Sequence, residues 1–186
     1  MTSQQQVFVV LLRGINVGGH NKIPMKELRA LCEGLGWTDV QSYIQSGNLL
    51  VTTDAAKESL QEELEQAIER RFGISIPVIA RYAGAWSNYI ENNPFVAAAG
   101  EDPSRVMLAL SKHPITEGAA ERLQEYAAAG ERVAAGEDVL YGYFPSGAAV
   151  SKLTPALFDR LVGSSVTVRN WRTVLKLGSM LQNTAR

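Results

Sequence analysis

Two kinds of hydrophobic pattern alternate along the chain, and their order limits the folds that it can adopt. Continuous apolar or β-branched runs are typical of strands, and apolar residues that recur every three or four positions are typical of helices. The first half has strand patterns at 7–12, 39–45, 48–53 and 74–82, and helical patterns at 24–35 and 54–72. This order, βαββαβ, is the ferredoxin-like arrangement, in which we expect the spatial strand order 4-1-3-2.

Details of the first half agree with that order. The unbroken apolar run 7–12 suits an interior strand, and Pro77 places the fourth strand at a sheet edge. Pro24 is predicted at the first position of the first helix, and Asp54 is predicted to cap the second. Cys32 falls on the apolar stripe of the first helix, which predicts an inert core thiol.

The same order recurs in the second half. Strand patterns lie at 105–111, 131–135, 139–145 and 165–170, and helical patterns at 116–129, 154–163 and 171–183. Thr154 is predicted to cap its helix and Gly163 to end it. The sequence therefore predicts an α+β protein of two tandem ferredoxin-like halves, 1–83 and 104–186, the second with an added C-terminal helix. The connector 84–103 is expected to contain a short helix.

One loop stands out as a candidate binding site. The stretch "RGINVGGHNK", residues 13–22, is longer than most strand-to-helix connections and has a cation at each end. The crossover between parallel strands brings it to the same end of the sheet as the turn "QSGN", residues 45–48. The predicted rim residues are Arg13, Asn16, Gly18, Gly19, Lys22, Gln45, Ser46 and Asn48. A purely structural interpretation stays open, because glycine and asparagine also serve tight turns.

The second half has a weaker candidate. The loop after 139–145 and the end of the last strand should also meet at one end of their sheet. Its candidate residues are Ser151, Lys152, Arg169, Asn170 and Trp171. A structural interpretation, with Asn170 as a helix cap and Trp171 as a wedge beneath the last helix, is slightly favoured over a site.

Several specific chemistries lack their motifs. Residues 14–22 lack the Lys-Ser/Thr pair of a P-loop, and no G-x-G-x-x-G motif is present. His20 and His113 lack metal-ligand spacing, so neither a metal nor a cofactor is expected. No catalytic set is recognisable, and whether the chain catalyses a reaction is left open.

Composition bears on the partners. A net charge of −1 gives little attraction to nucleic acid, and no apolar run approaches the length of a membrane span. The N-terminus has no signal-peptide pattern, so we expect a cytoplasmic protein without a membrane partner. Tyr141 and Tyr143 share a strand face, which keeps a nucleic-acid stacking platform as an alternative. The oligomeric state is not specified by the sequence.

Three motifs, in order, carry a family resemblance: "LLRGINVGGHNKIPMKEL", "YIQSGNLLV" and "VTVRNWRTVLKL". With them the chain resembles the bacterial family called domain of unknown function 1697. The resemblance implies two ferredoxin-like parts and no established activity. The leading hypothesis is a protein that binds a small phosphate- or carboxylate-bearing ligand at the rim. The alternatives are nucleic-acid binding through sheet-face aromatics and a module for protein contact or self-association.

Overall fold

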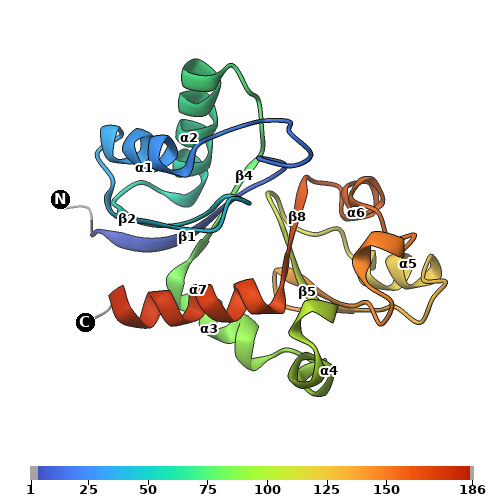
Figure 1. Cartoon of the computed structure of the whole chain (residues 1–186). Coiled ribbons are helices and arrows are strands. Elements are labelled where there is room, and N and C mark those ends of the chain that lie inside the picture. The colour runs from blue at the N-terminus through green and yellow to red at the C-terminus, as the bar shows by residue number, and fades with distance from the viewer. Residues whose placement is uncertain (1–3, 185–186) are drawn as a thin grey trace. The chain divides into compact units, whose positions relative to one another are not determined.

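The computed structural model describes residues 4–184, which divide into two compact units (Figure 1). The N-terminal unit comprises the chain up to Trp86 together with the residues from Met180 onward, and the C-terminal unit comprises Ser87–Ser179. Each unit contains a four-stranded antiparallel sheet with helices on one face, so the predicted α+β class and the two ferredoxin-like sheets are confirmed. None of the helices within residues 4–184 has the length and apolar character of a membrane span.

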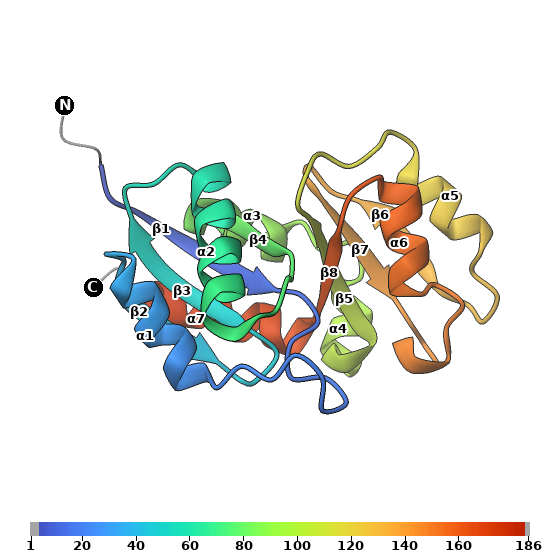
Figure 2. The same cartoon turned by 90° about the horizontal axis from the view of Figure 1, so that it is seen from above.

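The sheet of the N-terminal unit has the order β2-β3-β1-β4, as predicted. Its strands are β1 (Gln6–Leu12), β2 (Thr38–Tyr43), β3 (Asn48–Thr53) and β4 (Val78–Tyr82). Helices α1 (Met25–Gly34) and α2 (Lys57–Phe72) cover one face (Figure 2). The apolar run of β1 is interior because it pairs with both β3 and β4, and β4, which follows Pro77, lies at an edge.

The core of this unit forms between the sheet and the two helices. Alternate residues of β1, Phe8, Val10 and Leu12, face that core, where Leu28 from α1 and Leu64 from α2 pack against them. Cys32 belongs to the same cluster and is completely buried, as its spacing predicted. Each fully buried large apolar side chain of this kind contributes about 1.5–3 kcal/mol to the stability of the unit.

The helix starts differ from the predictions in two places. Pro24 is the residue before α1 and not its first residue, and α2 begins only at Lys57, after Ala56. Asp54 therefore does not cap α2, which has no side-chain cap hydrogen bond at its start. Asp54 lies two residues before the Ncap position, too far back to bond the first turn.

The C-terminal unit has the sheet order β6-β7-β5-β8, the same arrangement. Its strands are β5 (Val106–Ser111), β6 (Arg132–Ala135), β7 (Val139–Tyr143) and β8 (Val166–Asn170), and its helices on the sheet are α5 (Ala119–Glu125) and α6 (Pro155–Val162). Thr154 accepts a hydrogen bond from the Leu157 N–H and Gly163 ends α6 in the left-handed conformation, which confirms both predicted ends of that helix.

The remaining helices precede β5 or follow β8. Helices α3 (Ala83–Glu91) and α4 (Val96–Glu101) and a 3-10 turn at Pro103–Arg105 occupy the predicted connector, and α7 (Trp171–Thr184) is the added helix. Helix α5 is shorter than its predicted span because Gly118 before it has a φ of 71°, a conformation that no helix continues through. At the far end of α7, Thr184 accepts a hydrogen bond from Gln41 of β2 at 3.1 Å.

Helix side chains hydrogen-bond the outer edges of the sheets. On α2, Gln61 and Glu65 accept from the backbone N–H groups of Ala80 and Val78 on β4, at 2.9 and 2.8 Å. In the C-terminal unit, Asp159 of α6 accepts from the Val166 N–H of β8 at 2.9 Å. Such contacts occupy strand edges that would otherwise offer pairing positions to another chain.

Candidate functional site

The loop between β1 and α1 is a small hairpin closed by backbone hydrogen bonds. The Asn16 N–H donates to the Asn21 carbonyl at 3.0 Å, and the His20 N–H donates to the Val17 carbonyl at 2.9 Å. At its tip, Gly18 and Gly19 have φ values of 56° and 80°, the pair of positive values that a type I′ turn requires. The two glycines are therefore needed by the turn, and their exposed backbone is also open to a ligand.

Asn16 ties the loop to the neighbouring turn. Its Nδ2 donates to the carbonyls of Ile23 at 3.0 Å and Gln45 at 2.8 Å, and its Oδ1 accepts from the Ile23 N–H at 2.9 Å. Its φ of 52° is one that asparagine tolerates better than most residues. The Leu12 N–H also donates to the Gly47 carbonyl at 2.8 Å, so the two predicted segments do meet at one end of the sheet. The Asn16 amide is occupied in holding them together.

The turn after β2 is shaped by packing. Asn48 is fully buried, and its Nδ2 donates to the Tyr43 carbonyl at 2.9 Å and to the Ser46 Oγ at 3.0 Å. Gly47 has a φ of 83°, and a Cβ there would lie 2.7 Å from the Leu12 Cβ. Asn48 and Gly47 therefore serve the turn itself.

A subset of the predicted residues faces solvent at this end of the sheet. Gly18, Gly19, Lys22 and Gln45 are exposed, and so is His20. Arg13 is half-buried, with its backbone N–H donated to the Pro77 carbonyl at 3.1 Å. We call Arg13, Gly18, Gly19, Lys22 and Gln45 the rim: two cations and two glycine peptides on the 13–22 loop, and one amide on the neighbouring turn.

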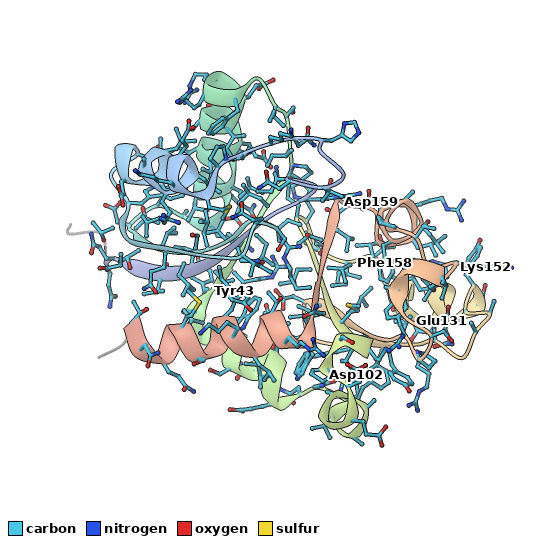
Figure 3. The ribbon with its side chains drawn as sticks, viewed as in Figure 1. Tyr43, Asp102, Glu131, Lys152, Phe158 and Asp159 are labelled. Atoms are coloured by element: carbon cyan, nitrogen blue, oxygen red, sulfur yellow. The ribbon has the colours of Figure 1, made fainter. Side chains whose placement is uncertain are left out.

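The second candidate site has a structural centre that the sequence did not reveal. Ser151 donates to the Glu131 carboxylate at 2.6 Å, and the N–H groups of Ala128 and Ala129 donate to its other oxygen at 3.1 and 2.7 Å. These hydrogen bonds, that of Ser151 first, lower the pKa of Glu131 to about 2. Lys152 is exposed nearby on the same loop as Ser151 (Figure 3). Ser151 therefore anchors a loop.

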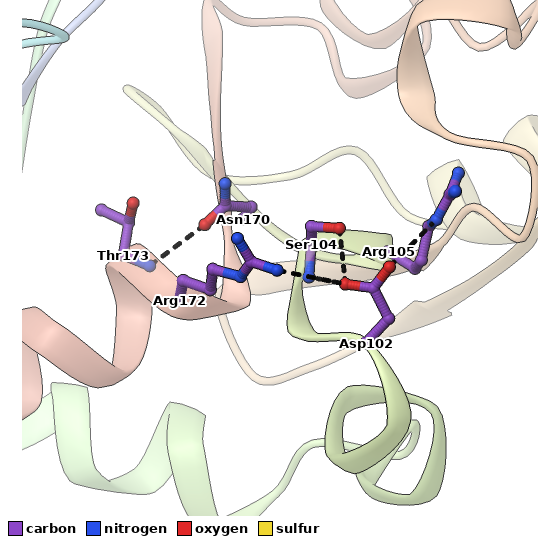
Figure 4. A network of polar contacts seen from close by, with 6 residues as sticks. All are labelled: Asp102, Ser104, Arg105, Asn170, Arg172 and Thr173. Carbon is purple, nitrogen blue, oxygen red and sulfur yellow. Dashed lines mark hydrogen bonds and ion pairs between the residues drawn. The ribbon is translucent and has the colours of Figure 1, made fainter.

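The other members of that site support the last helix. Asn170 Oδ1 accepts from the Thr173 N–H at 3.1 Å, a cap for α7, while Arg172 pairs with Asp102 at 3.6 Å (Figure 4). Asp102 also accepts from Ser104 and Arg105, and the Ser104 hydrogen bonds are the main cause of its lowered pKa. The cap and the acid–arginine cluster give Asn170 and Arg172 structural roles.

Aromatic rings of the C-terminal unit pack inward. Tyr141 is buried beside Trp171, with ring centroids 6.3 Å apart, and its hydroxyl donates to the Tyr89 carbonyl at 2.9 Å. Tyr143 is half-buried beneath the Arg132 guanidinium, 5.3 Å from the ring centroid. Arg169 is buried, and its Nη1 donates to Thr167 and to the Val168 carbonyl. Neither Tyr141 nor Trp171 offers an exposed face on which a base can stack.

Chemically reactive groups are scarce in the described part of the chain. Burial raises the pKa of the Cys32 thiol to about 12, so it is not a nucleophile at neutral pH. Residues 4–184 contain no cluster of three histidine, cysteine, aspartate or glutamate side chains suited to a metal ion.

The arrangement defines a tandem ferredoxin-like protein with a cationic loop on its N-terminal unit. Residues 6–141 match the family model described as a protein of unknown function, DUF1697, and the chain belongs to that family. It is similar in structure to the conserved bacterial protein SP0830 from Streptococcus pneumoniae, with 27% sequence identity and a TM-score of 0.76, over 96% of this chain and 99% of that one. No curated protein matched the chain.

Proposed function

We propose that the rim binds a small anion that carries a phosphate or a carboxylate. The observation that supports this proposal is a difference between the two units. The same strand-to-helix connection takes residues 13–24 in the N-terminal unit and only 112–118 in the C-terminal unit. The shorter loop shows how few residues the topology needs, so the 17–20 hairpin and the flanking cations are not required for chain closure.

Rim chemistry fits an anion. Arg13 supplies a planar fork suited to two oxygens, and Lys22 supplies a point charge. Backbone N–H groups near Gly18 and Gly19 add neutral donors where no side chain obstructs approach, since a Cβ on Gly19 would meet nothing within 4 Å. Asn16 and Asn48 hold the loop and do not contact the ligand in this proposal.

A thermal-shift screen of phosphorylated and carboxylated metabolites tests the proposal. Lys22→Ala removes an exposed cation, and Arg13→Lys keeps the charge but removes the fork. Each variant should weaken binding by about 10- to 150-fold, the cost of a lost charge-assisted contact. Lys26→Ala, an exposed cation of α1, is the matched control. The proposal fails if no anion stabilises the wild type, or if Lys26→Ala matters as much as Lys22→Ala.

A protein-contact function is the second candidate, and exposed apolar side chains next to the rim favour it. Val17 is 62% exposed and Ile44 is 50% exposed, and the hydrogen bond between their neighbours Asn16 and Gln45 makes the two segments adjacent. Ile44 has a φ of 50°, which is costly for a β-branched residue, and half of its side chain gains nothing from burial. Light scattering of wild type and Ile44→Asn tests whether this residue mediates self-association.

A further inference from the structure

A hollow on the outside of the N-terminal unit, lined by residues that do not belong to the rim, has the features of a second ligand site. It lies between α1 and α2 and has a volume of about 530 Å³, within the range of small-molecule sites. Its lining is formed by Glu27, Ala30, Leu31, Gly34, Leu35, Ala67, Arg70 and Arg71. The floor is therefore apolar, and the charged groups come from the first turn of α1 and the last turn of α2.

The two arginines of the hollow differ in their partners. Arg71 Nη2 lies 2.7 Å from Glu27 Oε2, and both side chains are roughly half exposed. The Arg71 guanidinium also lies 5.4 Å from the Phe72 ring centroid, which fixes its position. The Arg70 side chain has no hydrogen bond or ion pair with any residue in the described range 4–184. The hollow thus carries one net positive charge, with Arg70 available.

Helix electrostatics explains part of this arrangement. Cations in the last turn of α2 stabilise its C-terminus, and this is sufficient reason for one arginine there. It does not explain why both arginines lie beside an apolar hollow. Leu31 and Leu35 line that hollow and are only partly buried. A single positive charge beside an apolar floor is complementary to one negative charge on an apolar body.

From this complementarity we infer that the hollow binds an amphipathic monocarboxylate, a molecule with one carboxylate head and an alkyl body. The alkyl body lies over Leu31, Leu35 and Ala67, and the carboxylate pairs with Arg70. It also competes with Glu27 for Arg71. A dianionic phosphate monoester fits less well, because Glu27 cancels the charge of one arginine. The inference is independent of the proposed rim site, since no residue is shared.

Calorimetric titration of the full chain with decanoate tests the inference. Acetate has the carboxylate without the alkyl body, and decyltrimethylammonium has the alkyl body with the opposite charge. Neither should bind as tightly as decanoate. Arg70→Ala should weaken decanoate binding about tenfold or more. Lys176→Ala, an exposed cation of the C-terminal unit, should leave it unchanged.

Two further variants separate ligand binding from structure. Gly34→Leu should abolish binding by filling the hollow, and it should fold because a Cβ at Gly34 meets nothing within 4 Å. Glu27→Gln should strengthen binding several-fold by releasing Arg71, whereas a merely structural ion pair would give no gain. Arg13→Lys should have no effect, which keeps this test separate from that of the rim.

The opposite results would overturn the inference. These are no decanoate binding to the wild type, equal binding of decyltrimethylammonium, or unchanged affinity in both Arg70→Ala and Gly34→Leu. Self-association that Gly34→Leu abolishes would instead assign the hollow to a second copy of the chain.

Discussion

Replacing Gln61 of α2 by methionine should destabilise the N-terminal unit more than the same replacement at an exposed glutamine of that helix. Gln61 is only 2% exposed, and its Oε1 accepts from the N–H of Ala80, which is completely buried. Methionine has similar length and helix propensity but offers no comparable acceptor. The buried Ala80 N–H would then lack its partner, which costs about 1–3 kcal/mol.

Urea unfolding monitored by far-ultraviolet circular dichroism measures this loss. Gln66→Met is the matched control, because Gln66 lies on the same helix and is exposed. The control should change stability by less than about 0.5 kcal/mol. In a thermal scan, the Gln61→Met loss corresponds to a decrease in Tm of about 2–12 °C for a protein of this length. Equal stability of the two variants would refute the claim that side-chain capping of the β4 edge matters.

Four further predictions follow from individual residues. Gly47→Ala should destabilise the protein, as measured by a lower Tm, because the turn has neither room nor a suitable φ for a Cβ. Ile44→Asn should leave the Tm unchanged or raised, since asparagine tolerates the positive φ and half of the isoleucine is exposed. Cys32 should react with a thiol reagent only after denaturant is added, because it is buried and its pKa is raised to about 12; rapid labelling of the native protein would contradict this. Because the folded-state pKa of Glu131 is about 2 and its ordinary value is 4.5, its stabilisation is complete above about pH 4.5 and is lost as the pH falls toward 2. Glu131→Gln should therefore be less stable than the wild type at neutral pH, and the difference should shrink over that interval.

The central strand pairings could be predicted from the sequence because residues 7–12 and 106–110 are unbroken apolar runs. The first strand and 106–111 both pair on two sides, as their composition required. The roles of polar residues could not be predicted in the same way. Glu65, a charged residue of α2, accepts a hydrogen bond from the Val78 N–H. Such bonds join residues far apart in the chain, and helical periodicity carries no information about them.

The contact between the two loops was predicted, whereas the structural roles of their residues were predicted only in part. The topology alone predicted that the 13–22 loop and the 45–48 turn meet. The hydrogen bonds that Asn16 and Leu12 donate to this turn confirm it. The sequence did not show which asparagines face solvent. That depends on the backbone conformation, and asparagine permits a positive φ without requiring it. The contacts of Glu131 with Ser151 and of Asp102 with Arg172 were missed because the two partners of each pair are distant in sequence.

The two units share one unusual feature, a buried arginine near the end of an edge strand. Arg81 and Arg169 are each the fourth residue of a five-residue edge strand, and a helix follows each strand directly. Both arginines are buried, and each donates from Nη1 to the carbonyl of the residue before it. Burial lowers the pKa of Arg169 to about 10, so such a position is costly to maintain without a reason. Arg81 and Arg169 therefore occupy equivalent positions in two sheets of the same strand order. On that basis the C-terminal unit is an internal reference for the N-terminal one, and the longer 13–24 loop is a departure from the shared framework.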